Sequence, residues 1–475
     1  MPILALEAST SSAKAMLYDR GRVLGVESLP YPPDVSDGVT FSPDGVADTV
    51  LACGAALLRR FPGTTVEAIG LSSIWHSLVL LDGNRLPIGK GMTWADTSPA
   101  PTAARFRADA ALASRVYRTT GCPIHSIYNG WKWMHHKRTA DVSAVRHISC
   151  LPEYLHFALT DELMISQSAA AGSALLSTHT LDWDDGMLEL MGARRDMLGQ
   201  LVEPQYAGLL AGRAAGLLGL PAGTPVTATG PDGALNHIAA GGLAAGVMTL
   251  SVGTSGALRV AHKGPVIPER QSTWCYYGAE GLHIIGAATS GAGNCVNWFV
   301  RDVLGGSLGF DRLEAGAIAA NEQSAPFFLP FLFGERCPGW NDSRLGGFCG
   351  IGPDAPVGAL YRAVLEGILF NLYQNYRILL KNIGSAPSMI SISGGITQSK
   401  FWMRLAADTF GAPLNENTGE HASLLGAVFV AQRAIGQIAN LGDVPVEEGK
   451  RHLPDMARHD GIMERFERWM EYYDD

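Results

Sequence analysis

The sequence predicts an α/β protein built from two related halves. Short apolar strands alternate with longer segments of helical period along the chain, which is typical of an α/β fold. A three-stranded meander with a hydroxyl-rich first turn opens the chain at residues 3–29, and a similar strand–turn–strand unit recurs at residues 247–261. The length of 475 residues also exceeds one ordinary core. Two unrelated hairpins would look alike locally, so the repeat alone leaves this relation open.

Hydrophobic periodicity places the individual elements. Strands are expected over residues 3–6, 14–18, 23–29, 66–71, 78–81, 247–252, 257–261 and 390–393. Helices are expected over residues 47–60, 101–117, 129–136, 361–380, 400–410 and 422–435, with another opening at 151. The last ~25 residues are charged and predict a surface helix.

Composition excludes several classes of protein. The net charge of −9 gives no general basic surface for nucleic acid. The seven cysteines form no CxxC pair, so a zinc site or disulfide framework is not expected and a reducing compartment fits. Glu7 comes too early for a signal peptide, and no apolar run reaches the ~20 residues of a membrane span. We therefore expect a cytoplasmic protein without a membrane partner.

Three turns of small residues each follow an apolar strand. Backbone N–H groups in such turns form anion nests, and hydroxyl groups add further donors to phosphate oxygens. Phosphoryl transfer needs such nests, Mg²⁺ and a base for the acceptor hydroxyl. A GxxxxGK[ST] motif does not occur, which excludes a P-loop. The three turns are Ser9-Thr10-Ser11, Gly253-Thr254-Ser255-Gly256 and Gly394-Gly395.

One carboxylate near the middle of the chain, Asp232, is the candidate general base. It lies between Pro231 and Gly233, a context in which Asp is most often a plain turn residue. The three phosphate-type turns favour the catalytic alternative, because a carboxylate can accept a proton that leaves late in phosphoryl transfer.

A polar and aromatic cluster predicts a sugar site. Such sites combine aromatic faces with fixed hydrogen-bonding groups, although each Trp taken singly fits an ordinary core position better. His135 and His136 are adjacent and cannot share a helix face, so a metal role for them is not expected. The cluster comprises Trp75-His76-Ser77, Trp94-Ala95-Asp96 and the segment from His125 to Lys132.

At these residues the sequence resembles the FGGY family of carbohydrate kinases over nearly its whole length. The resemblance rests on residues 250–256, Asp232-Gly233, residues 346–351 with Glu366, and residues 394–399 with Asp408. It implies two ribonuclease-H-like domains, as in actin and hexokinase, with ATP in the interdomain cleft. We expect an N-terminal domain over residues 1–243 and a C-terminal domain over residues 244–475.

The resemblance also implies roles for the site residues. Asp232 would deprotonate the sugar hydroxyl, and Mg²⁺ would bind near Glu7 and Asp232. Substrate would contact Trp75, His76, Asp96, His125, Lys132 and Asn236. ATP would contact Ser9, Thr10, Ser11, Lys14, Gly253, Thr254, Ser255, Gly394, Gly395 and Ser399.

Within the family, several stretches look most like gluconate kinases, and Gly121-Cys-Pro-Ile-His125 carries the most weight. D-Gluconate is therefore the favoured substrate, with D-xylulose second, and Lys132, His76 and His125 could face a carboxylate. Glu7 and Ser9 depart from the Asp-x-Gly-Thr of the family, and a carboxylate misplaced by ~1 Å can cost ~10²-fold in rate. A weakened family member that only senses sugar and nucleotide is the alternative. The oligomeric state stays open, with a homodimer as one option.

Overall fold

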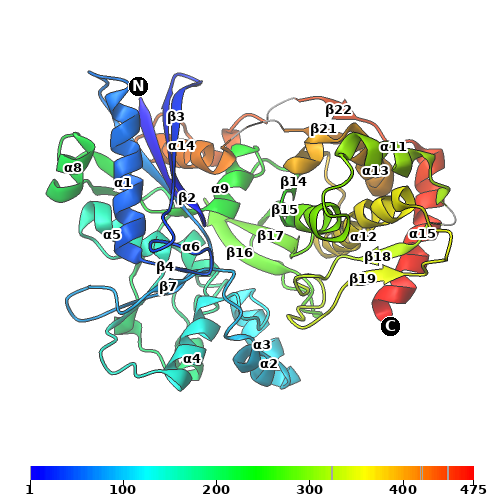
Figure 1. Cartoon of the computed structure of the whole chain (residues 1–475). Helices are drawn as coiled ribbons and strands as arrows, with labels where there is room; N and C mark the ends of the chain where they lie inside the picture. Colours follow the sequence, from blue (N-terminus) through cyan, green and yellow to red (C-terminus); the bar gives the residue numbers. More distant parts are fainter. Residues whose placement is uncertain (1, 323–324, 418, 420, 447–448) are drawn as a thin grey trace.

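The computed structural model describes residues 2–322, 325–417, 419, 421–446 and 449–475. Within these residues two seven-stranded sheets lie side by side, one in each half of the chain (Figure 1). The N-terminal sheet has the order β11-β12-β5-β1-β2-β3, with β13 beside β5. Its strands are β1 (Ile3–Ala8), β2 (Ser12–Asp19), β3 (Arg22–Pro30), β5 (Ala68–Ser73), β11 (Ala207–Leu209), β12 (Pro225–Thr227) and β13 (Gly230–Pro231).

The second sheet repeats this plan. Its order is β16-β17-β15-β14-β20-β21-β22. In both sheets three antiparallel strands, β3-β2-β1 and β17-β15-β14, are followed by two parallel ones, and β16 adds a fourth antiparallel strand at the edge of the second sheet. This shared order confirms the predicted relation between the halves. The strands are β14 (Val247–Val252), β15 (Gly256–Lys263), β16 (Trp274–Ala279), β17 (Leu282–Thr289), β20 (Met389–Ser393), β21 (Leu414–Glu416) and β22 (Arg451–His452).

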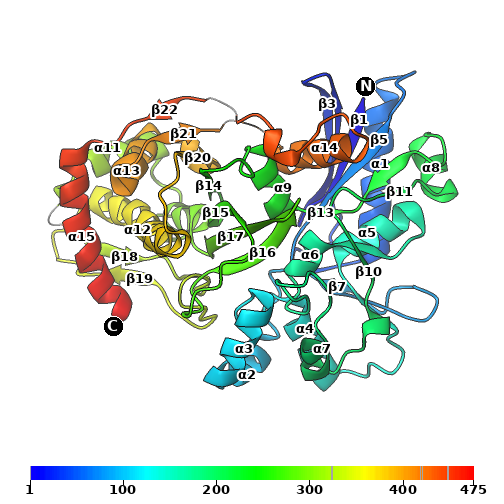
Figure 2. The ribbon, with the colours of Figure 1, turned by 180° about the vertical axis from the view of Figure 1, so that it is seen from behind.

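Helices cover both sheets, and one of them crosses between the halves. Helix α14 (Ala422–Ala434) comes late in the chain but packs on β1 and β5 and beside α9 (Asp232–Ala239) (Figure 2). A Cβ atom on Gly70 of β5 would lie 2.2 Å from the Ala427 carbonyl oxygen of α14. Only glycine permits this approach. Further long helices include α1 (Pro43–Arg59), α4 (Asn129–Thr139), α5 (Leu151–Thr160), α11 (Phe310–Ala319), α12 (Val357–Ile383) and α13 (Lys400–Phe410).

The structure corrects one expected helix and refines another. The segment 101–117 is two helices, α2 (Ala100–Arg107) and α3 (Ala110–Thr120), because Asp109 caps α3 by accepting a hydrogen bond from the Leu112 amide at 3.0 Å. The expected surface helix near the C-terminus, α15 (Met456–Asp474), is buried along one face, where Trp469 is fully covered. Its opposite face is exposed, as expected for a surface helix.

Candidate active site

Asp232 stands at the first residue of α9, directly after the short strand β13. Its Oδ1 oxygen accepts hydrogen bonds from the Gly233 amide at 2.7 Å and from the Trp75 amide at 3.4 Å. Trp75 follows the end of β5, which pairs with β13. The carboxylate is therefore fixed where a strand end meets a helix N-terminus, a position that favours negative charge.

The surroundings of Asp232 make it a stronger base than a free aspartate. Burial, followed by the negative charge of Glu7, raises the pKa of Asp232 to about 6, against the opposing charge of Arg259. The group is still mostly ionised at neutral pH. A carboxylate in this range is well matched to accepting a proton.

Glu7 lies at the end of β1 and is almost fully buried. Its Oε2 accepts a hydrogen bond from Lys14 Nζ at 3.0 Å, and its Oε1 accepts from the Ser72 hydroxyl at 3.2 Å. The Ser423 hydroxyl, at the N-terminal end of α14, also donates to Oε1. Glu7 thus joins both flanking strands to the crossing helix. Ser9, which replaces the glycine of the family motif, is not among the described residues with positive φ.

A pocket of about 310 Å³ opens beside Asp232 between the two halves. Aromatic rings form one wall: Trp75 lies 4.9 Å from Tyr276 between ring centroids, and Tyr276 stacks on Trp274 at 4.4 Å. The polar lining includes His76 and Asn236, which were predicted to contact the substrate, and Thr10 and Ser255, which were predicted to contact ATP. Flat rings with convergent polar groups suit a polyhydroxylated ligand.

The protonation state of His76 follows from its contacts. Its Nδ1 lies 2.9 Å from the Gly172 carbonyl oxygen, so Nδ1 carries the proton and donates. Burial and then the positive charge of Arg336 lower the pKa of His76 to about 3, which keeps the ring neutral. Its Nε2 is therefore left as a hydrogen-bond acceptor at the pocket wall, suited to a hydroxyl group rather than to a carboxylate.

Two arginines in the pocket wall had no role in the sequence prediction. Arg259 lies on β15 and Arg336 in the segment after β18 (Phe327–Leu329). The Nε atoms of both are buried without a hydrogen-bond partner. Among the described residues, neither arginine has a carboxylate within 4.0 Å, and Arg259 Nη1 donates to the Ser251 hydroxyl at 3.3 Å. A cation inside the otherwise apolar run 257–260 is the signal that could have revealed Arg259.

The cleft continues past Asp232 along two further pockets. The next one, of about 310 Å³, shares Asn236, Ser251, Ser255 and Arg259 with the first and adds the turns at Gly253-Thr254 and Gly394. A third, of about 440 Å³, shares Gly253 and Thr254 and is closed by Gly395, Ser399, Tyr361 and Trp402. A Cβ atom on Gly394, whose φ is +100°, would lie 2.5 Å from the Val252 carbonyl oxygen. The three pockets form one continuous path. It begins at the aromatic wall beside Asp232 in the first pocket, called the polyol pocket below, passes the small-residue turns, and ends at the aromatic residues of the third pocket.

Several predicted ligands lie outside this path. Lys132 is fully buried and its Nζ donates to the carbonyl oxygens of Asp96 at 3.1 Å and Ser126 at 3.2 Å. His125 Nε2 lies 2.7 Å from Asp342 Oδ1. A direct substrate contact of Asp96, His125 or Lys132 stays a prediction, as does contact of ATP with Ser9, Ser11 or Lys14.

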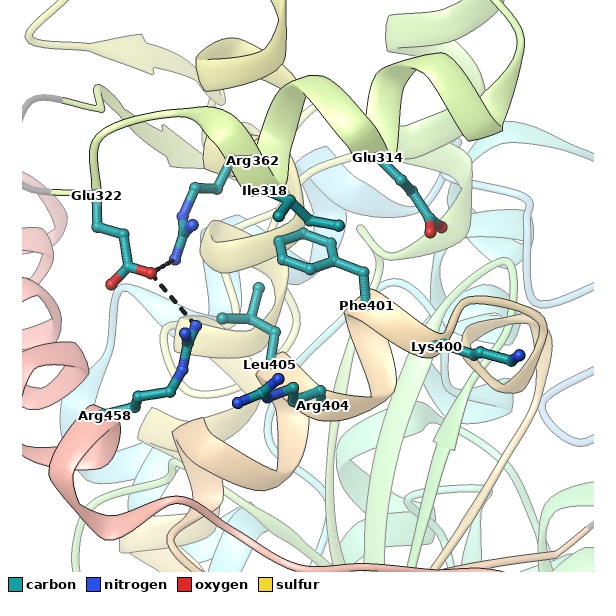
Figure 3. A pocket seen from close by; sticks show the side chains of 9 residues that line it. All are labelled: Glu314, Ile318, Glu322, Arg362, Lys400, Phe401, Arg404, Leu405 and Arg458. Carbon is teal, nitrogen blue, oxygen red and sulfur yellow. Dashed lines mark hydrogen bonds and ion pairs between the residues drawn. The ribbon is translucent and has the colours of Figure 1, made fainter.

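A separate pocket of about 340 Å³ lies between α11, α13 and the start of α15 (Figure 3). Arg362 Nη2 and Arg458 Nη2 both point to Glu322 Oε1, at 2.8 and 3.3 Å. It meets the path only through Glu314 and contains none of the predicted site residues.

The described residues contain no cluster of three or more His, Cys, Asp or Glu side chains arranged to hold a metal. Mg²⁺, however, commonly binds through one or two carboxylates plus substrate phosphates and water. Glu7 and Asp232 fit that limited demand. No helix in the described part of the chain is long and apolar enough to cross a membrane.

The family comparison agrees with this geometry. Residues 2–239 match the N-terminal domain of the FGGY family of carbohydrate kinases, and residues 248–435 match its C-terminal domain. The chain belongs to the FGGY family of carbohydrate kinases. Members of this family are phosphotransferases that use ATP as the phosphate donor, so the predicted family, fold and enzyme class are confirmed.

Relatives of this kinase carry two different substrate names. A gluconokinase of Bacillus subtilis is 27% identical over 95% of this chain and 91% of its own length. A xylulose kinase of Escherichia coli is 29% identical over 86% and 84%. Crystal structures of a gluconate kinase and a ligand-bound xylulose kinase, both from Lactobacillus acidophilus, each superpose with a TM-score of 0.94 at 27% identity. Each match spans the whole of this chain, together with 97% of the gluconate kinase and 98% of the xylulose kinase.

Proposed function

We propose that this kinase phosphorylates a sugar acid, with D-gluconate as the favoured substrate. The observation that carries the proposal is Arg336, whose guanidinium lines the polyol pocket without a carboxylate partner among the described residues. The side chain is only partly buried, but its Nε is covered and has no hydrogen-bond partner, and a substrate carboxylate would supply one. The planar fork of Arg also matches a carboxylate in two hydrogen bonds.

Asp232 then acts as the general base. It accepts the proton of the substrate hydroxyl as that oxygen attacks the γ-phosphate of ATP, and the bond between the γ-phosphorus and the bridging oxygen to ADP breaks. Arg259 lines both the polyol pocket and the next pocket, so it would neutralise charge on the transferred phosphoryl group. The turns at Gly253 and Gly394 would hold the phosphates of ATP.

Mg²⁺ bound with the nucleotide would be held by Glu7 and Asp232. It would supply positive charge to the phosphate oxygens. Lys14 Nζ forms an ion pair with Glu7 beside this position at 3.0 Å. The aromatic end, with Tyr361 and Trp402, would receive the adenosine.

The test is a coupled assay of ADP release with D-gluconate, D-xylulose, D-ribulose and glycerol. We expect the highest kcat/KM with gluconate. Arg336→Gln should lower kcat/KM for gluconate by about 100-fold, the scale of a lost charge-assisted pair, and change the neutral sugars less than threefold. Arg336→Lys keeps the charge, so its kcat/KM for gluconate should lie between those of wild type and Arg336→Gln. Higher kcat/KM with xylulose than with gluconate would support the ketose alternative.

A further inference from the structure

The segment that carries Arg336 bridges the two halves of the kinase. This segment, residues 330–346, runs between β18 and β19 (Gly347–Cys349) and is called the bridging loop below. Arg336 has no side-chain partner of its own among the described residues. Its position above the polyol pocket therefore depends on what anchors the backbone of the loop on either side.

The first anchor ties the loop to the C-terminal half. The carboxylate of Glu335 is buried at 2% exposure. It accepts hydrogen bonds from the Tyr473 hydroxyl at 2.6 Å, from the Gly339 amide at 3.1 Å and from Arg344 Nη1 at 3.2 Å. Tyr473 comes from the last turn of α15, so the end of the chain holds one side of the loop.

The second anchor ties the loop to the N-terminal half. Asp342 Oδ1 lies 2.7 Å from His125 Nε2 and accepts the Ser126 hydroxyl at 2.9 Å. Arg107 Nη1 lies 3.7 Å from Asp342 Oδ2. Trp340 of the same loop packs edge-on against His125, with ring centroids 5.3 Å apart. Four contacts thus join residues more than 200 positions apart in the sequence.

The contact with His125 has a definite chemistry. The Ile127 amide donates to His125 Nδ1 at 3.2 Å, so the proton of the neutral ring is on Nε2 and is donated to Asp342. Burial lowers the pKa of His125, although Asp342 opposes this. Burial alone would raise the pKa of Asp342, but the bonds from His125 and Ser126 lower it. A neutral donor therefore meets an ionised acceptor at neutral pH.

We propose that Asp342 is a positioning residue: by tying the bridging loop to His125 and Ser126, it sets Arg336 over the substrate. This inference rests on the proposed function, in which Arg336 receives the substrate carboxylate. His125 does not line the polyol pocket, and in this proposal its role is to hold the loop that contacts the substrate.

The test compares Asp342→Asn with Asp354→Asn, an exposed aspartate outside the three pockets of the path. Asp342→Asn should raise the KM for gluconate about tenfold, with kcat and the KM for ATP each within threefold of wild type. Asp354→Asn should behave as wild type. An equal rise in the KM for ATP would overturn the proposal, because a general loss of structure would affect both substrates. Should Asp342→Asn fail to fold, Ser126→Ala should give a smaller shift in the same direction, and an unchanged KM for gluconate would count against the proposal.

A double mutant separates positioning from an independent effect. In the Arg336→Gln background, Asp342→Asn should change the KM for gluconate less than twofold, since its effect passes through Arg336. If the two substitutions instead raise the KM for gluconate by factors that multiply in the double mutant, the proposal is wrong. If wild type phosphorylates only neutral sugars, the proposed function fails on its own, and the same cycle is run with the accepted sugar. A non-additive cycle there would still support the coupling, and an additive one would reject it.

Discussion

Lys14 and Glu7 face each other across the first hairpin, with Lys14 Nζ 3.0 Å from Glu7 Oε2. They are register partners of β1 and β2. Hydroxyl groups of Ser72 and Ser423 donate to the other carboxylate oxygen. The glutamate that replaces the expected aspartate is thus held by a strand on each side and by a helix from the other half of the chain.

Removing the charge of Glu7 should slow the reaction. Glu7→Gln leaves Lys14 without its counter-ion and removes one carboxylate from the proposed Mg²⁺ site, so we expect kcat to fall about 100-fold and the Mg²⁺ requirement to rise. A coupled assay with a Mg²⁺ titration measures both. Asp34→Asn, an exposed change on the same half, is the control. Wild-type kcat in Glu7→Gln would remove Glu7 from the site.

Asp232→Asn should abolish turnover and yet stabilise the fold. The pKa of Asp232 is raised from 3.8 to about 6, so the folded state prefers the neutral acid. The stability that the protonated Asp232 carboxyl contributes is fully present below pH ~4 and is lost as the pH rises through 6. At pH 7 the variant should therefore gain up to about 3 kcal/mol in unfolding free energy, and little at pH 4. Denaturant unfolding at both pH values measures this. Surviving turnover would disprove the base assignment.

The activity should fall in acid because the base must be ionised. With Asp232 at a pKa of about 6, kcat/KM should drop about tenfold per pH unit below that value. The negative charge of Glu7 contributes to this pKa, so the residual activity of Glu7→Gln should show its acid limb at lower pH. If wild type and Glu7→Gln lose activity at the same acidic pH, the acid limb belongs to a group other than Asp232.

Lys132→Met should affect stability more than substrate choice. Burial lowers the pKa of Lys132 to about 8, and its Nζ holds two carbonyl oxygens that would be left unpaired. We expect a loss of about 1–3 kcal/mol in unfolding free energy. The ratio of kcat/KM between gluconate and xylulose should change less than threefold. A selective loss of gluconate activity would instead support direct contact with the carboxylate.

Glu366→Gln should strongly destabilise the C-terminal half. Glu366 is 2% exposed and pairs with Arg362 at 2.7 Å and Arg465 at 2.7 Å, both of them buried. Breaking a buried pair costs about 3–5 kcal/mol, because the remaining charges stay uncompensated. Glu467→Gln breaks the exposed pair with Arg377 and should cost less than about 1 kcal/mol. Denaturant midpoints of the two variants test the difference.

Local patterns predicted much of the fold because each depends on neighbouring residues. The short apolar run before Glu7 and the small turn at Gly253-Thr254 are read from a few positions, and both lie where expected. The break at Asp109 was missed, because the Ala-rich pattern continues through a residue whose side chain caps a new helix.

The sequence alone determined the strand–helix order, the family motifs and the candidates Asp232, His76 and Thr254, since these rest on residues close together in the chain. Tertiary structure decided what depends on contacts between distant segments. Only the fold brings α14 back over the N-terminal sheet to Glu7, and Arg336 to the polyol pocket. Such contacts depend on shape and on buried charge, which a linear pattern of residue types does not encode.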